Sequence, residues 1–413
     1  MFNNTYIKHL IYLIIALTSI ILPIQASSPT HYKNILIGER AATMGGAFSA
    51  VSDDSSATFY NPAGLSHAPY SSITGSANTM YKTKTTFKDA IDQYDWERNS
   101  LSLKPNFFSM TFKHSDKWSW ALSYIVPDIQ IENQQSYFDD ISVANLYILD
   151  YHINDITTYV GPSISYKFSE KLSIGLSTYY FFRDKKTQYN QFLYSTEGEI
   201  NQWKTLDQAL NVYGIHPIIG MMWSPLDKWS LSLTYKSFSI SDSSLKQHII
   251  NFQENSSTDT TRTLEVSNIN ASYSLDYPTQ YSAGIAFFPS KYLLIASDID
   301  HYINANESLE DVTNISLGIE YFLKTSTAIR AGYFTNNSSS PTPNSDTSNI
   351  SKINLTGVTL GYTLYGISNS LTFGIILSQG NGLAQIYDNE SDNSGIINYT
   401  RSDTTFIISS SFY

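Results

Sequence analysis

The stretch KWSLSLTYKS, residues 228–237, shows the two-residue period on which the fold depends. Its aromatic and aliphatic side chains fill every second position, and serine, threonine or lysine fills the positions between them. Successive side chains of a β-strand point to opposite faces, so this stretch predicts a strand with one apolar and one small polar face. The same alternation recurs at residues 118–126 and 371–377. Such strands suit a soluble β-sandwich or a transmembrane barrel with a polar lumen.

The number and spacing of these strands separate the two architectures. About fourteen alternating segments follow residue 70, an even number as in bacterial outer-membrane barrels. Short connections, several of them with a lysine, alternate with long acidic ones near 83–102, 131–155, 188–207, 241–272, 304–310, 336–350 and 379–399. Short turns on one side and long loops on the other are typical of a transmembrane barrel. The sequence therefore predicts an all-β fold, a transmembrane antiparallel β-barrel of about fourteen strands.

The composition agrees with this fold and excludes several kinds of protein. The 413 residues include 31 Tyr, 21 Phe and 6 Trp, and 15% of them are charged, against about 25% in ordinary soluble domains. The absence of cysteine excludes disulfides and thiolate metal sites. The net charge of −11 argues against nucleic acid as a partner, because a phosphate backbone requires a basic surface.

The first 26 residues are predicted to be a secretory signal peptide. Lys8 precedes an almost wholly apolar run at residues 10–24, and Ala26 ends a small-residue cleavage site. A transmembrane anchor is the alternative, but the apolar run is short for a span. We expect export and a final location in the Gram-negative outer membrane.

Residues 35–65 differ from the rest of the chain. Their sequence, ILIGERAATMGGAFSAVSDDSSATFYNPAGL, is rich in small residues and lacks strand alternation. Gly45 and Gly46 interrupt a possible helix, and Asn61, Pro62, Ala63 and Gly64 predict a turn. Because small residues permit close packing in a confined space, we expect residues 27–69 to form a plug, or hatch, in the lumen of a barrel made by residues 70–413.

This segment resembles the start of the FadL/TodX family of outer-membrane hydrophobe transporters. The resemblance rests on residues 44–48, on the acidic pair Asp53 and Asp54, and on the Asn-Pro-Ala-Gly-Leu turn at 61–65. Weaker strand motifs follow in the family's order at residues 104–108, 316–321 and 329–333. The resemblance implies a fourteen-stranded barrel with an N-terminal hatch that takes up long-chain fatty acids or other hydrophobic small molecules passively.

The same resemblance implies partners and an alternative role. We expect a monomer that binds a hydrophobic small-molecule ligand and contacts outer-membrane lipid and lipopolysaccharide. The alternative is a FadL-like barrel that serves as a secretion-system shuttle or structural outer-membrane protein (PorV-like). Apolar residues of the long connections, among them Phe138, Tyr147, Leu149 and Leu193, are candidates for collecting the ligand at the surface.

Two features of the sequence bear on gating. In the family the third strand kinks and opens toward the bilayer, and Pro127 and Asp128 occupy the matching place. Proline lacks the N–H that a strand donates, so we expect a bend or an unpaired stretch there. The alternative is that the strand simply ends at Pro127. Movement of the hatch at Gly45, Gly46 and the turn 61–64 is the expected release step.

Charged residues on the lumen face provide further candidates. Arg183 and Lys185 share the parity of the small polar residues of their strand, so we expect them inside the barrel near its extracellular end. There they anchor an anionic head group or, alternatively, pair with other lumen charges. Arg330 is expected to face inward near the periplasmic end and to pair with a plug acid, Asp53, Asp54 or Glu39.

We predict that the protein is not an enzyme. The eight histidines show no HExxH spacing and no neighbouring nucleophile motif, so no catalytic residue, metal ligand or cofactor site is assigned. A cluster of His152 with Asp150 and Asp155 is the alternative.

Overall fold

The computed structural model describes residues 29–92, 94–141, 144–195, 200–255, 261–272, 275–344, 350–385 and 395–413. The predicted signal peptide, residues 1–26, lies outside these ranges. Among the described residues, no helix combines the length and the apolar character needed to cross a membrane.

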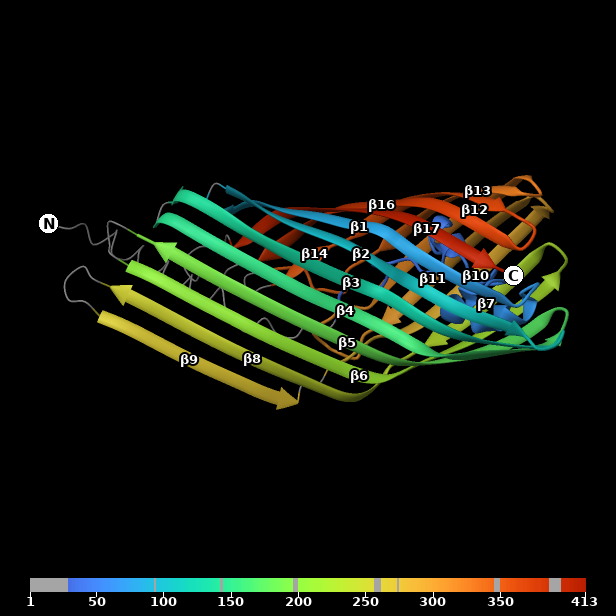
Figure 1. Cartoon of the computed structure of the whole chain (residues 1–413), viewed down its shortest axis with the longest axis horizontal. Helices are drawn as coiled ribbons and strands as arrows, with labels where there is room; N and C mark the ends of the chain where they lie inside the picture. The colour runs from blue at the N-terminus through green and yellow to red at the C-terminus, as the bar shows by residue number, and fades with distance from the viewer. Residues whose placement is uncertain are drawn as a thin grey trace.

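Antiparallel strand segments form a single closed ring, because the first segment pairs with both the second and the last (Figure 1). Three short helical segments precede them. The helical segments are α2 (Glu39–Thr43), α3 (Ala57–Tyr60) and η1 (Pro62–His67). The strand segments are β1 (Ser72–Ile91), β2 (Tyr94–Lys113), β3 (Trp118–Ile141), β4 (Ala144–Ser169), β5 (Leu172–Tyr194), β6 (Ile200–Leu226), β7 (Trp229–Lys236), β8 (Ser239–Asn255), β9 (Thr261–Ser272), β10 (Thr279–Ser290), β11 (Leu293–Ile303), β12 (Val312–Lys324), β13 (Thr327–Asn336), β14 (Ser351–Ile353), β15 (Leu355–Tyr365), β16 (Asn369–Gln385) and β17 (Ile396–Phe412).

Three strands of the barrel are interrupted. Segments β7 and β8 both pair with β6, and β14 and β15 both pair with β16. Segments β9 and β10 pair with β8 and β7 respectively, so they are two parts of one strand. The seventeen segments therefore make fourteen strands, which confirms the predicted barrel.

The alternation read from the sequence separates the inner and outer faces of the wall. On β5, Ser173, Ser177 and Tyr179 are fully buried inside the barrel, whereas Ile174 and Leu176 are 43% exposed on the outer face. Small inward hydroxyls leave room for a plug and supply hydrogen-bond partners for it. Outward aliphatic side chains suit contact with lipid.

The wall has very different heights on its two sides. Strands β3 to β6 contain 23 to 27 residues, and β10 to β13 contain 10 to 13. In Figure 1 the long strands, with β8 and β9, run far beyond the ends of the short ones. The prediction of long loops near 83–102, 131–155, 188–207 and 241–272 was therefore wrong. These stretches continue the strands, but many of their outward residues are polar, so the apolar alternation is interrupted there.

The tall part of the barrel is filled by its own side chains. Phe138, Tyr147, Leu149 and Leu193, predicted to collect ligand on surface loops, point inward and are buried in one apolar cluster. Residues from β1, β2 and β14 to β17 complete this cluster from across the lumen. The tall end is therefore closed by an aromatic core.

The N-terminal segment lies inside the ring. The described plug, residues 29–69, packs α2 against β13 and β15 to β17, and η1 against β3 to β6 (Figure 1). Barrel glycines permit this approach, since a Cβ on Gly175 would lie 2.3 Å from the carbonyl carbon of Pro62. The plug thus fills the lumen near the short turns, below the aromatic core.

Candidate functional site

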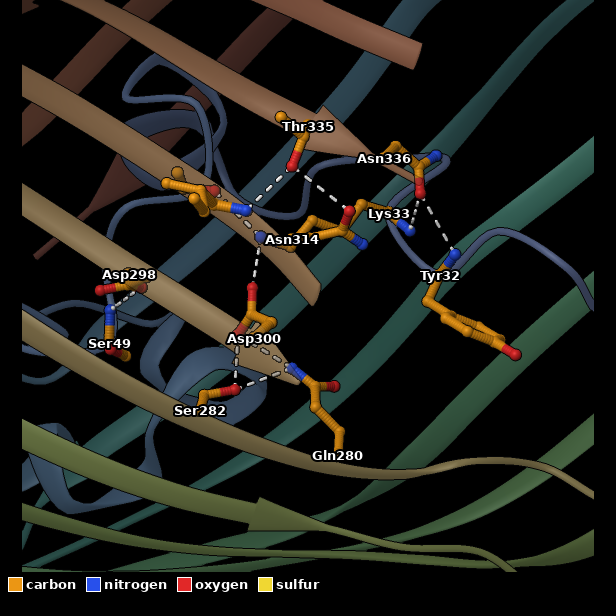
Figure 2. A network of polar contacts seen from close by, with 12 residues as sticks. Tyr32, Lys33, Ser49, Gln280, Ser282, Asp298, Asp300, Asn314, Thr335 and Asn336 are labelled. Atoms are coloured by element: carbon orange, nitrogen blue, oxygen red, sulfur yellow. Dashed lines mark hydrogen bonds and ion pairs between the residues drawn. The ribbon is translucent and has the colours of Figure 1, made fainter. Parts of the chain in front are cut away.

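Buried acids of β11 hold the plug on one side of the barrel (Figure 2). The Asp298 carboxylate accepts hydrogen bonds from the backbone N–H groups of Phe48 and Ser49 at 2.9 and 2.8 Å. Asp300, two residues further on the same inward face, forms an ion pair with Lys33 of the plug. Figure 2 shows Asp300 beside Ser282 as well, whose hydroxyl donates to it. Consecutive backbone N–H groups bind an anion well, so Asp298 fixes this turn of the plug.

A second anchor joins the plug to β12 and β13. Glu320 accepts from Arg40 of the plug at 2.6 Å and from Arg330 of β13 at 2.6 Å, and both Glu320 and Arg330 are buried. Arg40 also pairs with Asp53 within the plug. Removing one member of a buried ion network is costly, because the remaining charges lose their partners.

The predicted pairing of Arg330 with a plug acid was wrong. Arg330 does face inward and is buried, but its acid is Glu320 on the neighbouring strand. Asp53 pairs with Arg40, and Asp54 accepts from the backbone and hydroxyl of Ser56. Glu320 is the register partner of Arg330 and therefore lies closer to it than any plug acid, but no local sequence pattern indicates this pairing.

The turn at residues 61–64 is firmly attached to the barrel. The Asn61 amide donates to the carbonyl of Met221 at 3.1 Å and accepts from the N–H of Ala63 at 3.1 Å. The carbonyl of Ala63 accepts from the Ser165 hydroxyl at 2.8 Å. A gating role for this turn stays a prediction, and movement there would break these contacts.

Gly45 and Gly46 make the other sharp bend of the plug. Both have positive φ, 68° and 81°, a conformation that favours glycine. A Cβ on Gly45 would lie 2.8 Å from the carbonyl oxygen of Tyr333, so the plug backbone touches β13 directly. The bend also delivers the N–H groups of Phe48 and Ser49 to Asp298. Their gating role likewise stays a prediction.

The wall is unpaired between β2 and β3 beside Pro127. The two strands pair from Phe107 and Ile125 to the short turn, and again only at Ser100 and Glu132. Residues 101–106 and 126–131, which we call the window, form no β2–β3 pairs between these points. Pairing of β3 with β4 also shifts between Ile125 and Asp128.

Two prolines explain the window. Pro127 lies on its β3 side and Pro105 on its β2 side, and neither has an N–H to donate. The strand continues past Pro127, so the alternative that it ends there is wrong. Asp128, just beyond the kink, points inward and accepts from the side chain of Asn34 at 3.0 Å, which links the window to the plug.

Two cavities adjoin the inner side of the window. One, of about 200 Å³, has a polar lining that includes Arg98, Glu132 and Arg401. The other, of about 80 Å³, is bordered by Pro127 and Asp128 and walled largely by aromatic rings. These rings belong to Tyr32, Phe59, Tyr159, His216, Phe238, Tyr277 and Tyr302. We call the second one the aromatic cavity.

The two cationic candidates on β5 both face the lumen, but they differ in their relation to Asp155. Arg183 is 4% exposed and forms a bidentate pair with Asp155, at 2.8 and 2.6 Å. Its guanidinium is thus already neutralised by a buried carboxylate. Lys185 is 7% exposed and lies opposite Asp155 in the strand register. A head-group role for Lys185 stays a prediction.

The histidine cluster considered as an enzymatic alternative is not assembled. His152 contacts Asp150 at 2.8 Å on the outer side, whereas Asp155 points into the lumen toward Arg183. Within the described residues, no group of three or more His, Asp or Glu side chains is placed to hold a metal ion.

Comparison with known proteins identifies the family. The sequence profile described as "Outer membrane protein transport protein (OMPP1/FadL/TodX)" matches residues 36–293. The chain belongs to this family. The family consists of outer-membrane transport proteins, which agrees with the barrel, and the predicted resemblance is confirmed. A search of curated protein sequences finds no match.

Solved structures of similar fold share little sequence with this family member. The toluene transporter TodX of P. putida matches with a TM-score of 0.66 and 16% identity, covering 90% of this chain and 97% of TodX. The CymD monoaromatic hydrocarbon channel matches with a TM-score of 0.61 and 13% identity, and the match covers 92% of this chain and 98% of CymD. A Pseudomonas aeruginosa FadL homologue matches with a TM-score of 0.60 and 11% identity, and the match covers 94% of this chain and 99% of the homologue. At this identity the likeness concerns the fold alone.

Proposed function

We propose that this family member mediates passive uptake of small hydrophobic molecules across the outer membrane. The observation that carries the proposal is the aromatic cavity, which lies inside a plugged barrel and directly beside the window. Its rings offer apolar surface to a hydrophobic ligand, and Asn34, Asp128, Thr157, Lys236 and Gln280 add polar groups to the lining. The aromatic core must open to admit the molecule at the tall end, and the cavity must widen from about 80 Å³ to hold it. The molecule then leaves through the window into the bilayer.

The contacts favour an uncharged, compact aromatic ligand over a long-chain fatty acid. The Arg183 guanidinium, expected to anchor a carboxylate, is occupied by Asp155. Lys236, which also borders the cavity, lies over the ring of Phe59 at 4.4 Å. Ring faces from several strands surround the small volume, and aromatic rings pack well edge-to-face or offset. The named activity of TodX, toluene transport, supports the same ligand class.

Release requires movement on the window side of the plug. Asn34 holds Asp128 next to the kink with one hydrogen bond, whereas the opposite side of the plug is held by buried ion pairs. Because Lys33 is itself held by Asp300, we place the movement at the side chain of Asn34 rather than at the turn 61–64. Displacement of Asn34 connects the aromatic cavity to the unpaired strands.

Uptake measurements in cells that lack other channels of this family test the proposal. Saturable uptake of radiolabelled toluene, several-fold above uptake of oleate, is expected for the wild type. Phe238→Trp should reduce it, because Phe238 stacks on His216 at 4.0 Å and a larger ring fills the cavity. Tyr281→Trp on the outer face is the matched control and should leave uptake unchanged. Equal oleate and toluene uptake would favour the fatty-acid alternative, and no saturable uptake would favour a shuttle.

A further inference from the structure

The outer surface of the tall wall carries a groove of about 870 Å³. It crosses β3, β4, β5, β6, β8 and β9, which pair side by side. Two rows of outward side chains line it, one residue from each strand in each row, and the residues between the two rows complete the lining. The row nearer the membrane consists of Ile131, Asn154, Lys186, Ala209, Lys246 and Asn270.

Strand parity places this groove outside the lumen. Lys186 lies on the same face of β5 as Ile174 and Tyr180, both exposed on the outer surface. Thr187, between the two rows, points inward and is buried. The groove therefore lies outside the aromatic cavity, and it meets the window only at Ile131.

The groove lies just above the hydrocarbon region. On β5 the outward apolar residues extend from Leu172 to Phe182, and Asp184 is the first charged residue after them. Ten residues of strand span ~33 Å, and a tilt of about 40° reduces this to ~25 Å of membrane thickness, the height of a typical apolar band. Lys186 and Gln188 follow within six residues of Phe182, so the groove faces the saccharide layer of the outer leaflet.

The row nearer the membrane suits a phosphate. Lys186 and Lys246 are the register partners of Ala209 on either side, so two cations flank a small residue across about 10 Å of sheet. Within the described residues Lys246 has no ion-pair partner, and Lys186 has only the exposed Asp184 at 3.7 Å. Of the two acids in the lining, Asp207 belongs to the other row, and Glu132 is buried and pairs with Arg98.

The row farther from the membrane suits sugar hydroxyls. It contains the amides Asn133, Gln188 and Asn268, which both donate and accept hydrogen bonds. His152 and His248 alternate with them, and each already contacts a neighbour, Asp150 or Asn268. Across the sheet, the groove ends at β9, the last strand that it crosses. The other edge of β9 pairs with no strand among the described residues.

We propose that this groove binds the phosphorylated saccharide part of a lipopolysaccharide molecule in the outer leaflet. A phosphate lies between Lys186 and Lys246, and the sugar ring extends along the amide row. The volume lies within the ~300–1,000 Å³ typical of small-molecule sites. The bound lipid covers a polar sheet face that otherwise stands in the saccharide layer. This inference does not depend on the proposed uptake function.

Lipopolysaccharide titration of the purified full-length barrel in detergent tests this site. Lipopolysaccharide should raise the midpoint of thermal unfolding of the wild type at saturable concentrations. The double variant Lys186→Gln/Lys246→Gln should weaken that response at least tenfold, since glutamine keeps the chain length and removes the charge. The matched control is Lys291→Gln/Lys324→Gln at the periplasmic end, which removes the same charge and should respond like the wild type.

Titrations with other ligands identify which part of the lipopolysaccharide molecule the groove recognises. Phosphatase-treated lipopolysaccharide should bind the wild type as weakly as the double variant binds the untreated molecule. Inorganic phosphate alone and phosphatidylglycerol micelles should give no saturable shift. Circular dichroism without ligand checks that both double variants fold. Equal lipopolysaccharide affinity for the wild type and Lys186→Gln/Lys246→Gln, or an equal response to phosphatidylglycerol, would overturn the proposal.

Discussion

The plug meets two different kinds of barrel wall. Toward β11, β12 and β13 it is fixed by buried carboxylates that bind its backbone and its cations, through Asp298, Asp300 and Glu320. Toward β2 and β3 it faces the window, where these strands do not pair with each other. There the hydrogen bonds of Asn34 to Asp128 and of Asn106 to the carbonyl of Leu36 join it to the wall. A plug anchored firmly on one side can move on the other without leaving the lumen. Four substitutions test this difference.

Glu320→Gln should have the largest effect on the anchored side. The substitution leaves Arg40 and Arg330 buried without their shared anion, and breaking a buried ion pair costs about 3–5 kcal/mol. Urea unfolding of the detergent-solubilised barrel should show this loss, together with faster proteolysis of the plug. Glu97→Gln is the control, because its pair with Lys84 is exposed and is worth about 0–1 kcal/mol. Equal stability of the two variants would refute the anchor.

Gly45→Ala should cause the next largest loss of stability. Alanine is strained at φ 68°, and its Cβ meets the Tyr333 carbonyl oxygen at 2.8 Å, so we expect a loss of about 2 kcal/mol. Urea unfolding of the detergent-solubilised barrel measures this loss as well. Gly75→Ala provides the matched control, since its Cβ meets only a Phe108 ring atom at 4.0 Å. A Gly45→Ala protein as stable as Gly75→Ala would show that the plug backbone is not held tightly against β13.

Asp54→Asn should stabilise the plug at neutral pH. Burial, together with the nearby Glu39 carboxylate, raises the pKa of Asp54 to about 6. The folded protein thus holds a proton that the unfolded chain releases near pH 4, so the contribution of Asp54 is fully favourable below pH 4 and is lost as pH rises to 6.

Replacing this carboxyl removes the penalty while keeping an oxygen for Ser56. The gain should be about 1–2 kcal/mol above pH 6, allowing for partial exposure, and should vanish near pH 4. Thermal unfolding midpoints across this pH range measure it, with Asp116→Asn in an exposed turn as the control. A gain that stayed constant with pH would contradict this explanation.

Pro127→Ala should have the smallest effect on stability and the clearest effect on function. Alanine restores an N–H donor at the window, which adds about 1 kcal/mol if a β2–β3 hydrogen bond forms. Toluene uptake should then fall several-fold, because the loose side of the wall is closed. Pro289→Ala, near the end of β10 and away from the window, serves as the control. Unchanged uptake in Pro127→Ala, with the extra strand pair present, would exclude the window as the exit.

Particular residues show how far the sequence was informative. Alternation on β5 and β7 correctly predicted which side chains face lipid, and Pro127 correctly predicted a disturbed strand. Arg330 was correctly placed inside, but its acid was not, because a one-dimensional pattern does not distinguish Glu320 on the neighbouring strand from a plug acid far along the chain. Pro105 and Asp298 were missed for the same reason, since each acquires its role only from a neighbour distant in the chain.

The sequence by itself determined the class of fold, the number of strands, the small-residue plug and the inward or outward direction of residues in the apolar, alternating parts of the strands. These follow from local rules, namely the two-residue period and the lack of an N–H in proline. Only the tertiary structure decided how high each part of the wall rises, which acids hold the plug and where cavities and grooves form. Those properties depend on strand register and on contacts across the lumen, which bring together residues that no local pattern connects.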